Sequence, residues 1–388
     1  MKYTDISTIL NSEIVANALG QSVTVAEDLS NIVEFGTAVG SLSADALKNF
    51  TKSVIAGVYT YAINRMIETK EFKLLRDSQT YGGCLQRIMN KGLLQAKSTD
   101  FLNPQPNVNY WDGQWYGPDV DSKLYEETKS FKTIISLSED ALAQWFNNAQ
   151  DTDKLISMIY ANEKNTVKFE LMQLEKRVVV SLAYGAVTGS RALHLITLFN
   201  NNIIGASSSA DPNWKDITAI KADRDLMAYF QAYCKECIMR AKDRLKDVQD
   251  ITNDGTVITW SRDEDIKAVF ISEFLNDMAW LGSPIQYHDT PLPLTDYETI
   301  TAWQNAGNQI LADYTLSTTI TVDNNGTPAS ETDIVGVLYD IESAGVTLRS
   351  ERTVAEGPMP TGHINFHHNI AYNYFVDTRL SSIALCLD

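Results

Sequence analysis

Residues 138–189, SEDALAQWFNNAQDTDKLISMIYANEKNTVKFELMQLEKRVVVSLAYGAVTG, carry the longest regular pattern in the chain. Ser138, followed by Glu139 and Asp140, is typical of a helix start, because a hydroxyl can cap the first N–H groups and acids lie at the positive end of the helix dipole. Apolar side chains then recur at spacings of three, four or eight, which keeps them near one face: Leu155, Ile159, Val167, Leu171, Leu174, Val178 and Leu182. The stretch therefore predicts an amphipathic helix.

This helix is expected to be unusually long. After a break near Asp151, the pattern continues without interruption from Asp153 to Tyr184, and Gly185 and Gly189 are suitable stop residues. At 1.5 Å per residue the uninterrupted part would measure roughly 48 Å. Globular helices average only about 11 to 12 residues, so a rod of this length constrains the architecture around it.

The N-terminal part of the chain is less regular. Residues 1 to about 50 mix short apolar clusters with Ser, Thr, Asn and Gly, and we expect a loosely packed arm there. From Ser43 to Thr69 apolar residues return at near-helical spacing, with Ser43 as a possible cap, which predicts a helix.

Residues 92–137 interrupt the helical patterns. Prolines and glycines break any helix in this stretch, and Phe131–Leu137 alternates and becomes β-branched, as a returning strand would. Connections inside compact domains usually run about 4–6 residues, and the aromatic content argues against disorder. Five aromatic residues stand in this stretch: Tyr110, Trp111, Trp115, Tyr116 and Tyr125. We expect a long, ordered excursion.

These aromatic residues have two interpretations. A platform that stacks sugars or bases is one, but a nucleic-acid platform also needs a basic groove, and the nearby charges are Asp112, Asp119 and Asp121. Trp and Tyr also dominate the energetics of protein–protein contacts. We therefore favour a subunit interface formed by the five aromatic residues.

The rest of the chain combines helices with strands. A helix is expected at 216–248, and a short one at 273–281. Strand patterns occur at 257–260, 267–272, 318–322, 334–339, 345–349, 371–376 and 382–387, and Asn325-Gly326 is a hairpin-turn dipeptide. The sequence as a whole therefore predicts an α+β fold.

Composition limits the possible partners. The chain has 388 residues, 49 acidic against 32 basic side chains, and a formal net charge of −17. Affinity for nucleic acid comes largely from basic side chains on phosphates, so sequence-specific binding of DNA or RNA is disfavoured, although enclosing DNA is compatible with an acidic wall. There is no apolar run of about 18 residues that would span a membrane, no secretory signal, and only four scattered cysteines. We expect synthesis in a cytoplasm with reduced thiols.

No motif with a specific chemistry emerges. Cys234 and Cys237 form a lone CxxC in the middle of a helical stretch, without a second pair to complete a zinc site. His363, His367 and His368 lack the Glu of an HExxH motif, and on a strand positions four apart are roughly 13 Å apart. We interpret these histidines as solvated or interface residues. Phosphate loops, nucleophile elbows and calcium loops are missing from the sequence. We predict no catalytic, cofactor-binding or metal-binding residue, and no enzyme.

The order of the parts resembles the major capsid proteins of tailed bacteriophages, with the Hong Kong 97-type fold, and is most similar to those of small short-tailed phages (podoviruses). The closing segment is the most specific local similarity, because such proteins often end with a strand, a polar link, and a strand that carries an Arg before a final apolar run. The matching residues are Val346-Thr-Leu-Arg-Ser-Glu-Arg352, Phe366-His-His-Asn369 and Asp377-Thr-Arg-Leu-Ser-Ser-Ile-Ala-Leu-Cys386.

The resemblance implies a division of the chain into five segments. Residues 1–68 would be the N-terminal arm and first helix, and 69–137 the extended loop. Residues 138–249 would be the peripheral domain with its spine helix, 250–345 the axial domain, and 346–388 the closing strands of the peripheral domain. The helix at 216–248 is long for its place, and 306–333 looks like an insertion.

The function implied is structural. Copies would form pentamers and hexamers of an icosahedral phage head, assembled in the host bacterial cytoplasm, which encloses double-stranded DNA in the virion. Scaffolding, portal and minor capsid proteins would be the other partners, with no cofactor and no membrane. An encapsulin-like nanocompartment shell is the nearest alternative, and an α/β enzyme or carbohydrate-binding protein a more distant one.

Overall fold

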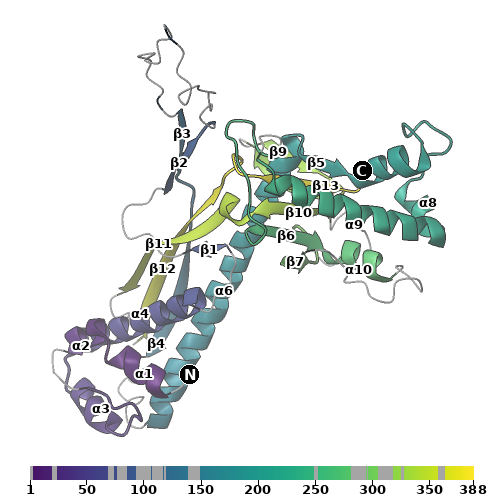
Figure 1. Cartoon of the computed structure of the whole chain (residues 1–388). Coiled ribbons are helices and arrows are strands. Elements are labelled where there is room, and N and C mark those ends of the chain that lie inside the picture. Colours follow the sequence, from purple (N-terminus) through teal and green to yellow (C-terminus); the bar gives the residue numbers. More distant parts are fainter. Residues whose placement is uncertain are drawn as a thin grey trace. The chain divides into compact units, whose positions relative to one another are not determined.

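The computed structural model describes residues 3–19, 24–68, 74–76, 85–92, 106, 117, 119–138, 149–248, 252–280, 294, 296–304, 318–324, 327–356 and 363–388 (Figure 1). The chain divides into two compact units. Unit 1 comprises residues 1–84, 126–175 and 345–375; unit 2 comprises residues 85–125, 176–344 and 376–388. Each unit is thus assembled from three separate stretches, and residues 138–249 are divided between the two units at residue 175.

Unit 1 is built on a four-stranded sheet in the order β1-β11-β12-β4. Its strands are β1 (Leu75–Arg76), β11 (Ala344–Ala355), β12 (His363–Val376) and β4 (Thr128–Ser138). β12 and β4 are antiparallel and stay in register from the His363–Ser138 pair to the Asn373–Thr128 pair. The strands predicted at 131–137, 345–349 and 371–376 are confirmed, and each is longer than its sequence pattern indicated.

The helices of unit 1 correct one prediction. They are α1 (Tyr3–Leu10), α2 (Glu13–Leu19), α3 (Ile32–Gly40), α4 (Ala44–Glu68) and the first part of α6 (Ala149–Thr188). Residues 1–50 are therefore not a loosely packed arm: Ile6, Leu10 and Phe35 belong to the buried core that Phe50 and Ile159 complete. Helices of seven to nine residues are too short to display a clear periodicity in sequence. The helix predicted at 43–69 is confirmed as α4.

Helix α6 is longer than predicted, with 40 residues. It begins at Ala149 and has no break at Asp151, which lies in its first turn, where an acid is favourable. It also passes through Gly185 and ends at Thr188, just before Gly189. Ala183 and Ala186 are fully buried on either side of Gly185, and this packing outweighs the weak helix propensity of glycine. The helix start expected at Ser138 lies outside this element, since β4 includes Ser138 and residues 139–148 are not described.

Unit 2 is built on a five-stranded mixed sheet in the order β5-β13-β10-β6-β7. Its strands are β5 (Ala192–His194), β13 (Ser382–Cys386), β10 (Ile334–Asp340), β6 (Ile266–Ile271) and β7 (Tyr297–Ile300). β10 is antiparallel to both neighbours, whereas β5 and β7 pair in parallel at the two edges. The strands predicted at 267–272, 334–339 and 382–387 are confirmed. The strand predicted at 257–260 is wrong, because only Thr259 makes an isolated bridge there.

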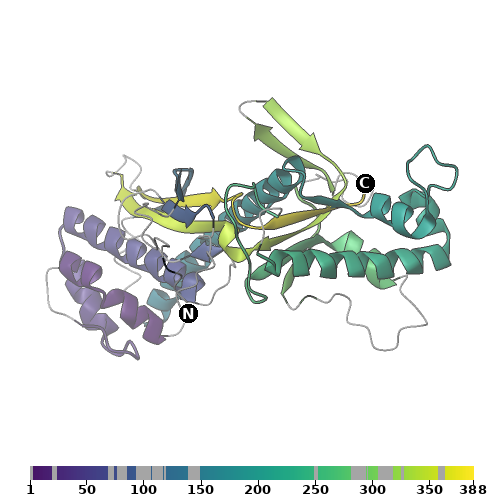
Figure 2. The same cartoon turned by 45° about the horizontal axis from the view of Figure 1, so that its top comes forward.

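Helices cover this sheet. They are α7 (Leu195–Phe199), the π-helix η1 (Asn200–Ile204), α8 (Ile217–Ala222), α9 (Arg224–Lys246) and α10 (Ser272–Trp280). α9 runs alongside the sheet (Figure 2), and its Phe230 and Ile238 share one apolar core with Phe270 of β6 and Leu385 of β13. The single helix predicted at 216–248 is two helices, since Asp223 adopts extended backbone and caps α9 by accepting hydrogen bonds from the next turn.

Two hairpins stand apart from these sheets. β2 (Leu85–Asn90) pairs with β3 (Val120–Tyr125), and β8 (Ile320–Asn324) pairs with β9 (Thr327–Glu331). The second hairpin brackets residues 325–326, but the strand that follows them is β9 and not the strand predicted at 334–339, which is β10 of the five-stranded sheet. Among the described residues, no helix is long and apolar enough to cross a membrane.

We predict that Gly336→Ala destabilises the protein by about 1–3 kcal/mol, because overpacking a filled core costs energy of that order. A Cβ at Gly336, in the central strand β10, would lie 2.6 Å from Cδ1 of Phe270. Gly92→Ala is the matched control, since nothing lies within 4 Å of the added Cβ. Urea denaturation followed by circular dichroism measures both. Equal stability of the two variants would contradict the packing described for β10.

Candidate functional site

The β2–β3 hairpin has two chemically different faces, because side chains alternate along each strand. Its register places Arg87 opposite Lys123 and Ile88 opposite Ser122. One face is partly or fully covered: Leu85, Arg87, Met89, Asp121, Lys123 and Tyr125. The other is exposed throughout: Gln86, Ile88, Asn90, Val120, Ser122 and Leu124. We call the first the inner face and the second the outer face.

The inner face lies against a buried ion pair between Asp377 and Arg379. Asp377 is 0% and Arg379 2% exposed. Arg379 donates from Nε to Oδ1 of Asp377 at 2.9 Å and from Nη2 to Oδ2 at 3.0 Å, a two-bond geometry that suits a guanidinium and a carboxylate. Asp377 follows the end of β12, and its Oδ1 also accepts a bond from the backbone N–H of Arg379. This local turn holds the two side chains toward each other.

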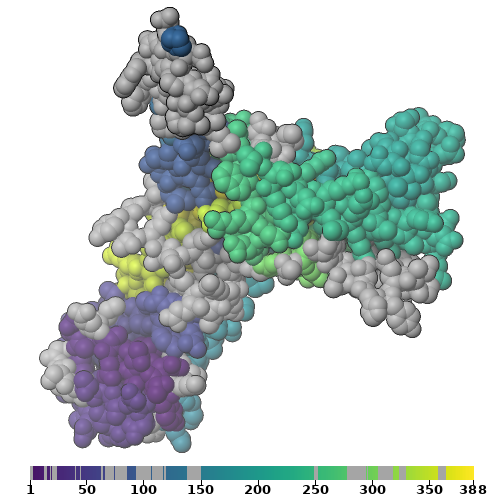
Figure 3. Space-filling view, in the orientation of Figure 1, coloured from purple at the N-terminus to yellow at the C-terminus, as the bar shows by residue number. Residues whose placement is uncertain are grey.

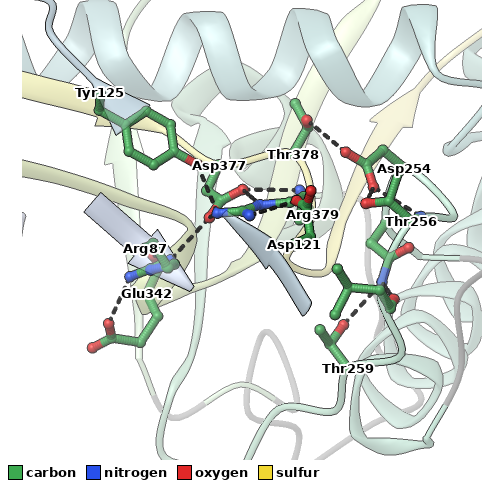
Figure 4. A network of polar contacts seen from close by, with 12 residues as sticks. Arg87, Asp121, Tyr125, Asp254, Thr256, Thr259, Glu342, Asp377, Thr378 and Arg379 are labelled. Carbon is green, nitrogen blue, oxygen red and sulfur yellow. Dashed lines mark hydrogen bonds and ion pairs between the residues drawn. The ribbon is translucent and has the colours of Figure 1, made fainter. Parts of the chain in front are cut away.

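Three hairpin side chains complete the network around this pair (Figure 4). The Asp121 carboxylate of β3 accepts a bond from Nη1 of Arg379 at 2.7 Å. Nη1 of Arg87, on β2, lies 3.3 Å from Oδ2 of Asp377. Nη2 of Arg379 lies 3.4 Å from the hydroxyl of Tyr125. Both strands of the hairpin are therefore bound to one buried pair, and the alternating charges compensate each other.

Arg87 extends the network to the end of the central strand β10. It donates to the backbone carbonyl of Glu342 at 2.7 Å and to the Glu342 carboxylate at 3.0 Å. The backbone N–H of Asp377 in turn donates to the carbonyl of Ser343 at 2.7 Å. The network therefore joins the hairpin to the five-stranded sheet of unit 2 through the turn that follows β10.

A second set of contacts fixes the turn after Asp377. Thr378 donates to Asp254 at 3.2 Å, and the N–H of Asp254 donates to the carbonyl of Thr378 at 3.0 Å. Thr252 donates to the hydroxyl of Ser381 at 3.0 Å. Arg191, after α6, donates to the hydroxyl of Ser382 at 3.0 Å. The turn that carries the ion pair is thus hydrogen-bonded on several sides.

The electrostatics favour the charged forms of the pair. Burial alone would raise the pKa of Asp377, but hydrogen bonds from Arg379 and Tyr125 outweigh it and hold the pKa below its usual value. The hydrogen bonds to Asp377 raise the pKa of Arg379 in turn. Because the folded pKa of Asp377 lies below that of an unfolded chain, its stabilisation is complete above a pH of about 4 and is lost as the pH falls through the folded pKa.

The outer face of the hairpin has a different character. Its apolar side chains Ile88, Val120 and Leu124 are 62%, 47% and 52% exposed. Part of the hairpin surface (blue, beneath the grey atoms) is visible in the space-filling view (Figure 3). Among the described residues, β2 and β3 pair with each other and with no further strand.

Unit 1 also exposes an apolar stripe, on helix α6. Met158, Phe169 and Met172 are all about half exposed or more. Their separations of eleven and three residues correspond to about three turns and one turn, so the three side chains lie along one side of the helix. The opposite side holds the buried positions, including Ile159, Val167 and Leu171.

The aromatic residues predicted as interface residues have different outcomes. Tyr110, Trp111, Trp115 and Tyr116 lie outside the described residues. Tyr125 is described and is buried on the inner face of the hairpin, where it contacts Arg379. Within the single chain it supports the hairpin, and a subunit contact by Tyr125 stays a prediction.

The histidines correct a second prediction. His367 and His368, on β12, are buried and not solvated. Nε2 of His367 lies 2.7 Å from Glu356, and Nδ1 of His368 lies 2.9 Å from the hydroxyl of Thr353. Within the described part of the chain, no three His, Cys, Asp or Glu side chains are grouped to hold a metal ion.

The other candidate groups have structural surroundings. Cys234 and Cys237 are buried in the middle of α9, and burial raises the pKa of both thiols. The exposed Asp263 pairs with Lys242 and Lys246 of the same helix at 2.9 and 2.6 Å.

We predict that Asp377→Asn lowers the free energy of unfolding by about 3 kcal/mol, because removing one partner of a buried ion pair leaves an uncompensated charge. The control is Glu264→Gln, which breaks the exposed pair between Arg262 and Glu264 at 3.8 Å and should cost less than ~0.5 kcal/mol. Urea unfolding at neutral pH compares the two. A cost for Asp377→Asn as small as that of the control would contradict the anchoring role of the pair.

The solved structures that are similar to this chain include several phage capsids. No family model and no curated protein matches the chain. The alignment with the capsid structure of Staphylococcus phage Andhra covers 80% of this chain and 82% of the capsid chain, at 9% identity and a TM-score of 0.43. The mature capsid of bacteriophage PhiM1 covers 81% and 84% at 9% identity and a TM-score of 0.40. The capsid of cyanophage P-SCSP1u covers 81% and 85% at 9% identity and a TM-score of 0.41. The capsid chains share few residues with this one, so its function is inferred from its own side chains.

Proposed function

We propose that this chain is the structural major capsid protein of a tailed bacteriophage. Copies assemble into the pentamers and hexamers of an icosahedral head that encloses double-stranded DNA, and the chain works as part of the virion. Its activity is the formation of contacts with copies of itself, and it is not an enzyme.

The observation that carries this proposal is the anchored hairpin with an exposed outer face. A two-stranded hairpin alone is at best marginally stable in water. Here Arg87, Asp121 and Tyr125 bind the inner face to the buried pair of Asp377 and Arg379. The anchor holds one orientation of the strands and leaves Ile88, Val120 and Leu124 on the other side. A rigid element that presents apolar side chains is suited to binding another protein surface.

A second copy of the chain is the partner that fits best. Each copy carries both the outer face of the hairpin and the apolar stripe on α6, formed by Met158, Phe169 and Met172. Two different surfaces that bind each other across copies form a head-to-tail contact, and such contacts close into rings when the rotation permits. The resemblance to capsid proteins implies the same arrangement, with the extended loop lying over a neighbour's spine helix. Trp111, Trp115 and Tyr116, within that loop, would be further anchors.

The net charge of the chain is consistent with a shell that encloses DNA without binding it. With a net charge of −17, a shell of this protein would repel double-stranded DNA instead of binding it through counterion release. DNA would then be enclosed without sequence-specific binding, after delivery by other components. Scaffolding, portal and minor capsid proteins are the partners that such a head requires.

We predict that Ile88→Asp combined with Leu124→Asp abolishes particle formation and leaves the subunit folded. Two carboxylates on the outer face would have to be buried without partners at the contact, which costs several kcal/mol, while in the free subunit they stay in water. Negative-stain microscopy and sedimentation velocity measure assembly, and circular dichroism checks the fold. The matched control is Gln86→Asn combined with Ser122→Thr on the same face, which should still assemble. Complete particles from the double Asp variant would exclude this face as a contact.

The contents of purified particles separate the proposal from its alternatives. Uniform particles that contain DNA are the expected result. Particles that contain an enzyme and no DNA would indicate an encapsulin-like compartment. A chain that stays monomeric at high concentration, with its melting temperature raised by a small molecule, would indicate an enzyme or a carbohydrate-binding protein.

A further inference from the structure

The interior of unit 1 contains a cluster of ionisable side chains that the proposed assembly contacts do not use. The cluster lies where α4 and α6 pack against the four-stranded sheet, and it draws on four elements. Its members are Tyr59 of α4, Glu163 of α6, Glu351 of β11, and His368 and Tyr372 of β12. Tyr59, His368 and Tyr372 are fully buried, and Glu163 is 2% exposed. Ionisable groups are rarely buried this completely unless they are paired.

Part of the cluster is hydrogen-bonded. Thr60 donates its hydroxyl hydrogen to Oε1 of Glu351 at 3.0 Å, and the hydroxyl of Thr353 lies 2.9 Å from Nδ1 of His368. The rings of Tyr59 and His368 are in contact, with centroids 3.8 Å apart. Nε2 of His368 lies 3.7 Å from Oε1 of Glu351, too far for a hydrogen bond. Glu351 and His368 therefore each have a threonine hydroxyl group as a hydrogen-bond partner.

Glu163 is less well satisfied. Its Oε1 is buried and makes no hydrogen bond, and the same holds for the hydroxyl groups of Tyr59 and Tyr372. Thr133, on β4, is the polar neighbour that favours the ionised form of Glu163, while the charge of Glu351 opposes it. A buried carboxylate without hydrogen bonds or a positive partner is costly, whereas a protonated carboxyl group is a neutral one and much cheaper to bury.

The titratable groups of the cluster do not offer Glu163 a compensating charge near neutral pH. Burial lowers the pKa of His368 to about 3, so its imidazole is neutral. Burial also raises the pKa values of Tyr59, Tyr372 and Glu351. For Glu163 itself, burial raises the pKa from 4.5 to about 7, with repulsion by Glu351 as a smaller cause and Thr133 acting in the opposite direction.

From this cluster we infer that Glu163 is a proton-binding site that couples the packing of α6 on the sheet of unit 1 to pH. In the protonated state its carboxyl group is accommodated among Tyr59, Tyr372 and Thr133. After ionisation the same group is a buried anion facing Glu351 and neutral rings, and the helix is held less firmly on the sheet. This inference does not depend on the proposed assembly, because every group in it belongs to unit 1.

The direction of the pH effect follows from linkage. The pKa of Glu163 is higher in the folded chain than its ordinary value of 4.5, so the folded state binds the proton more tightly than the unfolded state. The stabilisation that this gives is fully present below the ordinary pKa and is lost as the pH rises through about 7. Glu163 therefore contributes more stability in mild acid than in mild base.

The test compares the full-length chain with Glu163→Gln, which resembles the protonated carboxyl group in shape and cannot ionise. Between pH 5 and pH 8 the folded-to-unfolded ratio of the wild type should fall relative to that of the variant by on the order of 10- to 100-fold. Glu170→Gln, at a partly exposed position of the same helix, is the matched control and should follow the wild type. Parallel pH profiles of the wild type and Glu163→Gln would overturn the inference.

A second measurement covers the case in which the Gln variant does not fold. Infrared difference spectroscopy of the wild-type chain, labelled with carbon-13 at glutamate side chains, detects a protonated buried carboxyl group directly. The inference requires such a band at pH 6 and its loss by pH 8.5 with the secondary structure retained. Absence of the band at pH 6 would show that Glu163 is already ionised and would refute it.

Discussion

The buried ion pair of Asp377 and Arg379 is the interaction on which the proposed function depends. Two full charges without solvent need partners, since a lone buried charge costs several kcal/mol. The chain supplies these partners from the two strands of one hairpin: Asp121 bonds to Arg379, and Arg87 lies against Asp377. The requirement for charge compensation thus fixes which face of the hairpin turns inward. The alternation of a β-strand then determines that Ile88, Val120 and Leu124 turn outward.

In this arrangement one face of the hairpin fixes its position and the other face is available for binding. The inner face provides rigidity through directional, charge-assisted hydrogen bonds, which lose their effect if the geometry changes. The outer face provides apolar area, and apolar contacts are not directional, so this face can adapt to slightly different neighbours in the proposed pentamers and hexamers. Helix α6 has a similar division, with Val167 and Leu171 buried in the chain and Phe169 and Met172 exposed. A shell built from many modest contacts needs surfaces that are held in place before the partner arrives.

The sequence predicted the parts whose signals are local. The apolar repeat from Leu155 to Leu182 predicted α6, and β-branched alternation predicted β4, β10 and β13. Predictions failed where distant residues decide the structure. Residues 1–50 looked loosely packed because helices of a few turns show little periodicity, whereas Ile6 and Phe35 are buried by partners such as Ile159. The segment beginning at Asp377 was singled out by its resemblance to capsid proteins. Its partners were not, because Arg87 is 290 residues from Asp377 and Asp121 is 258 residues from Arg379. A local sequence pattern cannot indicate pairs so far apart. The burial of Tyr125 follows from the same contacts and could not be foreseen either.

Hydroxyl-radical footprinting of the free subunit and of assembled particles tests the central claim most directly, because radicals label exposed Met, Phe, Leu and Ile side chains. The account predicts that Ile88 and Leu124 of the hairpin, and Phe169 and Met172 of α6, are labelled in the free subunit and protected in particles. Equal labelling of these four side chains before and after assembly would show that neither surface is a contact between copies, and would contradict the account.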